Sequence, residues 1–168
     1  MLKILKPVPC LAPQPLPFDS FTFPGGECGF KLRVDHGLWA SMPGTATIVA
    51  RLQNSRDIMG LAMAKDALER FAPGLVNLFL PFCPYARQDR VCCAGESFSL
   101  KVFADLINAQ GYKSVHVFDP HSDVLGAVID RVRIIKQETI IGQFAAFNKR
   151  LQPMLPADQP LFVSPDAG

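Results

Sequence analysis

The sequence predicts an α/β fold with a mainly parallel sheet, and two observations carry this prediction. Short runs of apolar, often β-branched residues recur along the chain, and each has the length of a buried strand. Between them lie segments whose apolar residues recur with the period of an amphipathic helix. Because parallel neighbours need helical crossovers, strands that alternate with helices indicate a parallel sheet.

Length and composition fit one compact domain with a full core. The chain has 168 residues, of which 49% are hydrophobic. Its formal net charge is +2, and no run of lysine or arginine is dense enough to follow a phosphate backbone. We therefore expect no nucleic-acid partner.

The amino terminus and the cysteines bear on the compartment. Prolines interrupt the first apolar stretch at Pro7, Pro9, Pro13, Pro15 and Pro17, so it resembles neither a signal peptide nor a membrane span. The chain has five cysteines, an odd number, and two of them are adjacent, which is a poor basis for a disulfide framework. We expect a cytoplasmic protein without a membrane partner. No Cys-x-x-Cys pair supports a zinc site.

The first part of the chain divides into a proline-rich segment and a hairpin. We expect residues 1–20 to lie extended on the surface and residues 21–168 to form the α/β domain. From Phe21 to Val34, two arms of alternating apolar residues flank Gly25 and Gly26, which predicts a hairpin. Phe23 and Glu27 stand at its turn, where an aromatic ring and a carboxylate can bracket a purine; the alternative is a merely structural edge hairpin.

The remaining elements alternate along the chain. We expect strands at 47–50, 76–80, 115–118, 132–135 and 161–163. Helices are predicted at 57–71, 98–109, 123–130 and 138–151. In the second of these helices Phe98, Val102, Leu106 and Ile107 share one face, with Ser97 as the N-cap and Gly111 as the residue after the C-cap.

Two polar loops follow the strands at 76–80 and 115–118. The first loop contains Tyr85 and the four residues Arg87, Gln88, Asp89 and Arg90, and the second contains Asp119, His121 and Asp123. In an open parallel α/β sheet, ligands bind at the carboxyl ends of the strands. We therefore expect both loops to face one crevice.

The residue types in these loops suit a phosphate and a metal ion. Arginine can bind phosphate through two hydrogen bonds, and a neighbouring carboxylate such as Asp89 can orient it or hold Mg²⁺. The alternative for Arg87, Asp89 and Arg90 is a surface ion pair that closes the loop. From these residues we predict a domain that binds a nucleotide or phosphate together with a metal, without a defined reaction.

The second loop has alternating polar residues that an extended backbone would place on one side. Hard oxygen ligands such as Asp119 and Asp123 suit Mg²⁺, which usually shares its coordination with waters and substrate phosphates. The structural alternatives are an N-cap for Asp123, a turn before Pro120 for Asp119 and a hydrogen-bonded loop position for His121.

Five blocks in one order resemble the ribose-phosphate diphosphokinase family, also called phosphoribosyl pyrophosphate (PRPP) synthetases. The blocks are FPGGE at 23–27, PYARQDR at 84–90, S-x-K at 99–101, FDPHSD at 118–123 and VSPDAG at 163–168. Together they cover nearly the whole chain but only the amino-terminal half of the usual family length. The resemblance implies the first of two tandem phosphoribosyltransferase-like domains.

The resemblance also implies an activity and a set of site residues. Members of the family transfer the diphosphoryl group of Mg·ATP to ribose 5-phosphate, which gives PRPP and AMP. By this likeness Arg87 and Gln88 contact ATP with Asp89 and Arg90 beside them, His121 and Asp119 serve the Mg²⁺, and Asp166 lies near the ribose and the metal. Phe23 and Glu27 reach the adenine held by a neighbouring subunit, which implies a homo-oligomer.

The chain departs from the common family pattern in three places. Common members have a charged stretch and an R-A-P-I-S block where this chain has Val91–Ser99, and Cys92 stands where an acidic residue is usual. Gly25 replaces a polar residue of the hairpin. The basic catalytic loop and the acidic ribose 5-phosphate loop of the family belong after Gly168. The first departure is similar to phage and bacterial enzymes linked to nicotinamide salvage.

Three readings of the function follow. The first is the amino-terminal part of a PRPP synthetase, with the 168-residue chain expected to be inactive alone. The second is a non-catalytic nucleotide-binding, regulatory or oligomerisation module of the same family. The third, an enzyme that consumes PRPP, is disfavoured because its acidic phosphate loop does not occur in this sequence.

Overall fold

A computed structural model describes residues 2–8, 11–33, 45–70 and 73–147. The chain forms two units, Met1–Ile135 and Lys136–Gly168, and each is described by itself. The first unit contains both polar loops.

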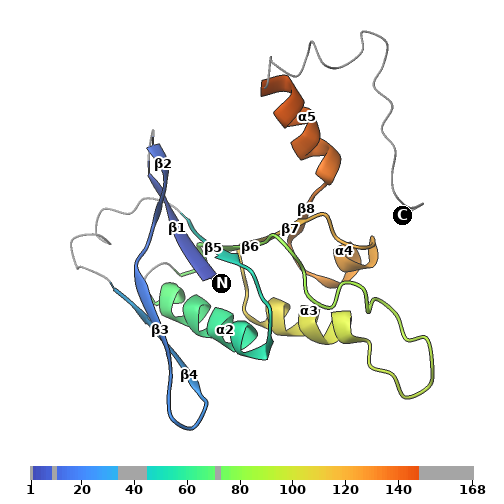
Figure 1. Ribbon diagram of the computed structural model, residues 1–168, viewed down its shortest axis with the longest axis horizontal. Helices are drawn as coiled ribbons and strands as arrows, with labels where there is room; N and C mark the ends of the chain where they lie inside the picture. Colours follow the sequence, from blue (N-terminus) through green and yellow to red (C-terminus); the bar gives the residue numbers. More distant parts are fainter. Residues whose placement is uncertain (1, 9–10, 34–44, 71–72, 148–168) are drawn as a thin grey trace. The chain divides into compact units, whose positions relative to one another are not determined.

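The first unit is built on a six-stranded sheet with the strand order β2-β1-β5-β6-β7-β8 (Figure 1). The strands are β1 Leu2–Val8, β2 Leu11–Pro15, β5 Ala46–Ala50, β6 Val76–Leu80, β7 Ser114–Phe118 and β8 Val132–Ile135. From β5 to β8 all neighbours are parallel, whereas β1 is antiparallel to both β5 and β2. The expected α/β class with a mainly parallel sheet is confirmed.

Three helices fill the crossovers between the parallel strands: α2 Ser55–Glu69, α3 Ser99–Ala109 and α4 Val124–Val128. Successive strands are added in one direction, so right-handed crossovers place these helices on the same face of the sheet. Figure 1 shows α2 and α3 along one side of the strands. The core lies between the layers, where Ile48, Leu78 and Phe103 are buried with Leu61 and Leu68 of α2.

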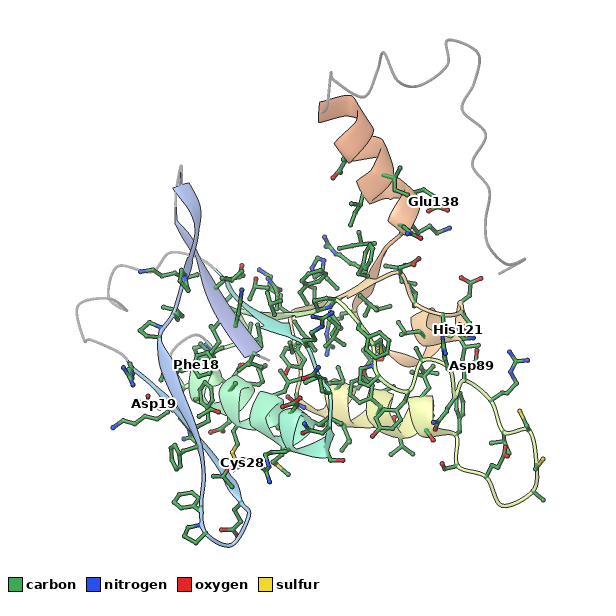
Figure 2. The ribbon with its side chains drawn as sticks, viewed as in Figure 1. Phe18, Asp19, Cys28, Asp89, His121 and Glu138 are labelled. Atoms are coloured by element: carbon green, nitrogen blue, oxygen red, sulfur yellow. The ribbon has the colours of Figure 1, made fainter. Side chains whose placement is uncertain are left out.

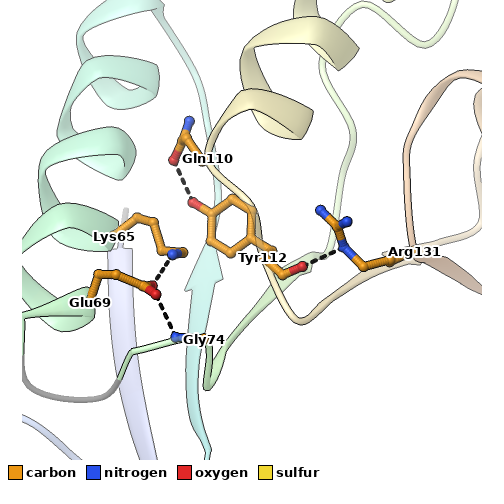
Figure 3. Close-up of polar contacts among 6 residues, drawn as sticks. All are labelled: Lys65, Glu69, Gly74, Gln110, Tyr112 and Arg131. Carbon is orange, nitrogen blue, oxygen red and sulfur yellow. Dashed lines mark hydrogen bonds and ion pairs between the residues drawn. The ribbon is translucent and has the colours of Figure 1, made fainter.

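A polar network joins α2 to the amino ends of the strands (Figure 3). The Lys65 side chain is only 7% exposed, and its ammonium group pairs with Glu69 one turn further along α2. Glu69 also accepts a hydrogen bond from the Gly74 N–H, just before β6. The Lys65 ammonium lies 5.5 Å from the centre of the Tyr112 ring, just before β7. This end of the sheet is therefore closed by buried contacts, while the carboxyl ends carry the loops.

The predicted hairpin is present as β3 Phe18–Thr22 and β4 Cys28–Leu32. At its turn the Phe23 N–H donates to the Glu27 carbonyl over 2.8 Å, and Gly26 has a φ of 90°, which glycine adopts without strain. The hairpin packs on α2, where the Cys28 and Met63 sulfurs are 3.8 Å apart.

The expectation of a surface segment at residues 1–20 is wrong for β1. This strand pairs on both sides within the sheet, and Ile4 is fully buried. Proline lacks the N–H that a ladder needs, so it is confined to sheet edges and irregularities. Pro7 lies where the register shifts between Lys6 and Val8, and Pro15 lies in the edge strand β2. The prolines therefore mark an edge and a bulge, and they do not exclude the segment from the sheet.

Two details of α3 also differ from the expectation. The helix begins after Phe98 without a side-chain cap, while the Ser97 hydroxyl pairs with that of Ser99 over 2.9 Å. Leu100, Phe103, Ala104 and Ile107 form its buried face, whereas Val102 and Leu106 are exposed. Because α3 is apolar around much of its circumference, periodicity alone did not identify the buried stripe. Gly111 follows the helix with a φ of 62°, as expected.

The second unit contains α5 Gln137–Phe147, with Glu138 in its first turn. The predicted strand at 161–163 and the site residue Asp166 lie outside the described residues. Among the residues that the structure describes, no helix combines the length and apolar character needed to cross a membrane.

Candidate functional site

The two polar loops meet at the carboxyl ends of β6 and β7. They line a cavity of about 390 Å³ whose walls include Arg87, Gln88, Arg90, Ser97, Ser99 and His121. Figure 2 shows Asp89 and His121 close together beside α4. The expectation that both loops face one crevice is therefore confirmed.

Backbone contacts fix the first loop. The Gln88 N–H donates to the Tyr85 carbonyl over 2.9 Å, and the Leu100 N–H of α3 donates to the Gln88 carbonyl over 3.2 Å. The Tyr85 ring packs against Phe103, with ring centres 5.8 Å apart. These contacts leave the Arg87 and Gln88 side chains exposed at the cavity.

Asp89 lies beneath this surface, with its side chain only 3% exposed. Ser122 Oγ donates to Asp89 Oδ2 over 2.6 Å, and Arg90 Nε donates to Asp89 Oδ1 over 3.0 Å. The hydrogen bond from Ser122, followed by that from Arg90, holds the pKa of the Asp89 carboxyl below its usual range. The ion pair considered from the sequence is therefore present between Asp89 and Arg90, but its carboxylate is buried and tied to the second loop.

The second loop turns instead of continuing β7. Asp119 has a φ of 43°, and its N–H donates to the Ile135 carbonyl over 2.9 Å. The expected alternation of Asp119, His121 and Asp123 on one side of an extended segment is therefore wrong. His121 lines the cavity, while Asp119 and Asp123 are exposed and do not belong to its walls. Asp123 precedes α4 without capping it through its side chain.

Backbone strain is concentrated at these two loops. Three non-glycine residues of the described ranges have a positive φ, and two of them, Tyr85 and Asp119, lie just after β6 and β7. Such conformations cost on the order of 1 to 3 kcal/mol and persist where the surrounding structure enforces them, often at ligand sites. The strain supports a functional role for this edge of the sheet.

The segment between the first loop and α3 is stabilised by hydrogen bonds to the side chain of Glu96. Glu96 Oε2 accepts hydrogen bonds from the N–H groups of Cys92 and Cys93, over 2.9 and 3.1 Å. Gly95 supplies a φ of 90° at the turn. Sequence reasoning missed this role of Glu96 and the contact of Ser122, although both residues stood inside segments that it had singled out.

The second loop contains the residue types on which the expectation of magnesium rests. Within the described ranges no three histidine, cysteine, aspartate or glutamate side chains gather as a metal cluster. Mg²⁺ is usually bound by one or two carboxylates, several waters and the phosphates of its substrate. The Asp119 carboxylate is exposed outside the walls of the cavity, His121 lines the cavity, and Asp166 lies outside the described residues.

The hairpin is not part of this cavity. Phe23 is 50% exposed and meets the Phe21 ring edge to face, with ring centres 5.0 Å apart. Gly29 leaves room for the Phe21 ring, because a Cβ atom there would lie only 2.3 Å from it. Figure 1 places the hairpin turn and the loop before α3 at opposite ends of the first unit. The structure thus gathers Arg87–Arg90 with His121, and it does not bring Phe23 and Glu27 to them.

The fold and the site define the class of the protein first. The chain is similar to the crystal structure of phosphoribosylpyrophosphate synthetase from Mycobacterium smegmatis, with a TM-score of 0.64 and 23% identity, covering 79% of this chain and 44% of that one. It is a phosphoribosyltransferase-like α/β domain with the polar loops at the carboxyl edge of its sheet.

Sequence relatives then identify the family. A ribose-phosphate pyrophosphokinase of Buchnera aphidicola is 31% identical over 113 residues, which are 67% of this chain and 34% of that protein. The enzymes of the same name from Aquifex aeolicus and Bacillus subtilis are each 30% identical, over 72% and 66% of the chain. No protein-family profile matches. The chain belongs to the ribose-phosphate pyrophosphokinase family and spans about a third of the length of these relatives.

Proposed function

We propose that this domain supplies the ATP-binding part of a ribose-phosphate pyrophosphokinase, which transfers the diphosphoryl group of Mg·ATP to ribose 5-phosphate. The products are PRPP and AMP. The observation that carries the proposal is the convergence of Arg87, Arg90 and His121 on one cavity at the carboxyl edge of the sheet. The sequence relatives named ribose-phosphate pyrophosphokinase support the reaction class.

Each side chain at the cavity has a task in this proposal. Arg87 and Gln88 are exposed, and a hydrogen bond to α3 fixes the backbone beneath them. They can therefore bind phosphate oxygens with little further loss of backbone freedom. Arg90 uses its Nε on Asp89, which leaves its two terminal NH₂ groups for the nucleotide. His121 faces the same space from the second loop.

Magnesium and ribose 5-phosphate complete the site. Asp119, His121 and Asp166 would hold the Mg²⁺ that ATP carries, and this ion would neutralise phosphate charge during the transfer. Phosphoryl transfer needs in-line positioning and charge neutralisation more than a protein nucleophile. Two arginines and a histidine at the cavity fit that requirement. Asp166 would also lie near the ribose.

We further propose that the protein acts as a homo-oligomer. Phe23 and Glu27 would contact the adenine of a neighbouring subunit, since Figure 1 places the hairpin turn away from the loop before α3 and neither residue lines the cavity. The two exposed rings of Phe21 and Phe23 offer the apolar surface that a purine needs.

The experiment that tests the site compares Mg·ATP binding with stability. We expect Arg87→Ala and His121→Ala to weaken Mg·ATP binding by about 10-fold or more, because hydrogen bonds to charged groups contribute on the order of 1.5 to 3 kcal/mol. Both side chains are exposed, so Tm should change by no more than about 2 °C. Isothermal titration calorimetry and thermal unfolding of the 168-residue chain measure the two effects.

Arg70→Ala is the matched control, because Arg70 is an exposed arginine that follows α2 and pairs with Asp66. It should leave Mg·ATP binding unchanged. Wild-type affinity in Arg87→Ala and His121→Ala would show that the cavity is not the nucleotide site. Binding without any ribose 5-phosphate-dependent formation of AMP, even in a chain of the relatives' length, would favour the alternative of a non-catalytic nucleotide-binding module.

A further inference from the structure

We propose that Ser122 is a positioning residue that locks the two loops of the site together through Asp89, so that Arg90 and His121 face one polyphosphate. The inference rests on the proposed function of this cavity and assigns a task to Ser122 and Asp89 within it. It concerns a hydrogen bond between loops that are 33 residues apart in sequence.

The geometry gives Asp89 two partners from two directions. Ser122 Oγ donates to Oδ2 over 2.6 Å, and Arg90 Nε donates to Oδ1 over 3.0 Å. The carboxylate is 3% exposed, whereas the Arg90 side chain is 74% exposed. Asp89 is therefore a buried residue that orients the exposed Arg90 side chain. Asp89 is part of the cavity wall, but its carboxylate is almost fully buried, so an incoming ligand would meet the exposed Arg90 side chain first.

The contact also determines where His121 can lie. The second loop is anchored at its start by the hydrogen bond from the Asp119 N–H to the Ile135 carbonyl and near its end by Ser122. His121 stands between these anchors and lines the cavity. One buried carboxylate thus orders an arginine directly and a histidine through the next residue in the chain.

Holding Arg90 and His121 in place before the ligand arrives should increase the affinity for polyphosphate. A cation already held in its bound geometry loses less conformational freedom when the ligand arrives. Without the Ser122 hydroxyl, Asp89 keeps Arg90 as its remaining side-chain donor, so the carboxylate holds Arg90 less firmly and the second loop is no longer bonded to the first. We expect polyphosphate binding to weaken while the fold persists.

The test uses inorganic tripolyphosphate as the probe and the 168-residue chain as the protein. We expect Ser122→Ala to weaken tripolyphosphate binding by about three- to ten-fold, the range of one well-placed hydrogen bond. Ser122→Thr, which keeps the hydroxyl, should restore the affinity to within about two-fold of wild type. Ser122→Cys, with similar volume and a weak donor, should behave like Ser122→Ala.

Ser114→Ala is the matched control. Ser114 is also half-buried and donates to a side chain of a neighbouring strand, Asn77 Oδ1, over 2.9 Å, but it lies at the amino end of β7. It should cost similar stability and leave tripolyphosphate affinity unchanged. A second readout is the NMR signal of the Arg90 Nε–H, which should exchange faster with water in Ser122→Ala and at the wild-type rate in Ser114→Ala.

The outcomes separate this inference from the proposed function. Tripolyphosphate affinity and Arg90 exchange equal to wild type in Ser122→Ala would overturn the role of Ser122, even if Mg·ATP binds. An equal loss of affinity in Ser114→Ala would also overturn it, because the effect would then follow general stability. Tripolyphosphate binding that depends on Ser122, without Mg·ATP binding, would support the inference and contradict the proposed function. Binding of neither ligand by the wild-type chain would contradict both.

Discussion

At the scale of single residues, Asp119 combines a strained backbone with an exposed carboxylate. Its φ of 43° lies in the left-handed region, where aspartate is tolerated better than most residues because its short polar side chain can interact locally. Its carboxylate is exposed, and in the proposed function it would serve Mg²⁺. Substitutions can separate these two properties, because glycine relieves the backbone without supplying a carboxylate.

We expect Asp119→Gly to retain the stability of the wild type or to exceed it by up to about 1 kcal/mol, while Asp119→Ala loses about 1 kcal/mol. Both variants should bind Mg·ATP more weakly than wild type, since both lack the carboxylate. Urea unfolding measures the first effect and calorimetric titration the second. Unchanged Mg·ATP affinity in both variants would show that Asp119 has only a backbone role.

At the scale of the helix, α2 contains two ion pairs of the same spacing in very different surroundings. Lys65 and Glu69 pair where the lysine side chain is 7% exposed, whereas both members of the Asp66–Arg70 pair are exposed. An exposed pair contributes about 0 to 1 kcal/mol, but removal of one partner from a buried charge leaves that charge without compensation. The two pairs should therefore differ in their effect on stability.

We expect Glu69→Gln to destabilise the protein by about 1 to 2 kcal/mol at neutral pH, and Asp66→Asn by less than about 0.5 kcal/mol.

The hydrogen bond from Lys65, followed by that from the Gly74 N–H, lowers the pKa of Glu69 against the effect of burial. A lowered folded-state pKa gives stability that is present above the ordinary glutamate pKa and is lost as pH falls through the folded value. The difference between wild type and Glu69→Gln should therefore shrink as pH falls below about 4. Urea unfolding at several pH values measures it, and equal losses for both variants would contradict the burial argument.

Gly60 and Gly111, one within a helix and one just after a helix, offer a second comparison. Gly111 ends α3 with a φ of 62°, while Gly60 lies inside α2, and a Cβ atom at either position would meet nothing within 4 Å. Alanine at 111 should cost about 1 kcal/mol because of its backbone, and alanine at 60 should gain up to about 1 kcal/mol from helix propensity. Thermal unfolding distinguishes the two signs, and a loss at position 60 would mean that Gly60 has a packing role.

Local patterns predicted the elements whose signals lie within a few residues. The bounds of β6 at 76–80 and β8 at 132–135 were predicted from compact apolar runs, and the hairpin from its two glycines. β1 was missed because proline has two meanings in a sequence: it excludes a segment from the middle of a sheet but is allowed at an edge or a bulge. Only the pairing partners of β1 decide between them, and one of these, β5, lies more than 40 residues away.

In the site, too, the sequence predicts what local signals encode, and it does not predict contacts between distant residues. Arg87 and His121 could be placed together from the sequence because the carboxyl ends of parallel strands meet at one edge of the sheet. The burial of Asp89 and its bond to Ser122 could not be predicted, since a loop-to-loop contact leaves no periodic signal. The buried stripe of α3 was also misjudged, because Val102 and Leu106 fit a helical period equally well.

At the scale of the whole molecule, the two ends of the parallel strands have different tasks. The amino ends are closed by Lys65, Glu69 and Tyr112, while the carboxyl ends carry strained, polar loops around a cavity (Figures 2 and 3). The hairpin contributes to neither end of the parallel strands, since its turn projects away from the loops that line the cavity (Figure 1). In the proposed function, Phe23 and Glu27 therefore act on a nucleotide bound by a second copy of the chain.

This requirement gives a prediction for mixed oligomers. Glu27→Ala removes the hairpin's part of a site and Arg87→Ala removes the cavity's part, so each variant alone should bind a fluorescent ATP analogue weakly. If each site is shared between two subunits, random exchange in a dimer should restore tight binding to about a quarter of the sites, because half of the dimers are mixed and each has one intact site. Fluorescence titration before and after mixing measures this fraction. Mass spectrometry of an isotope-labelled partner confirms that exchange has occurred. A mixture that binds no better than its parents despite complete exchange would assign the hairpin a structural role within its own chain.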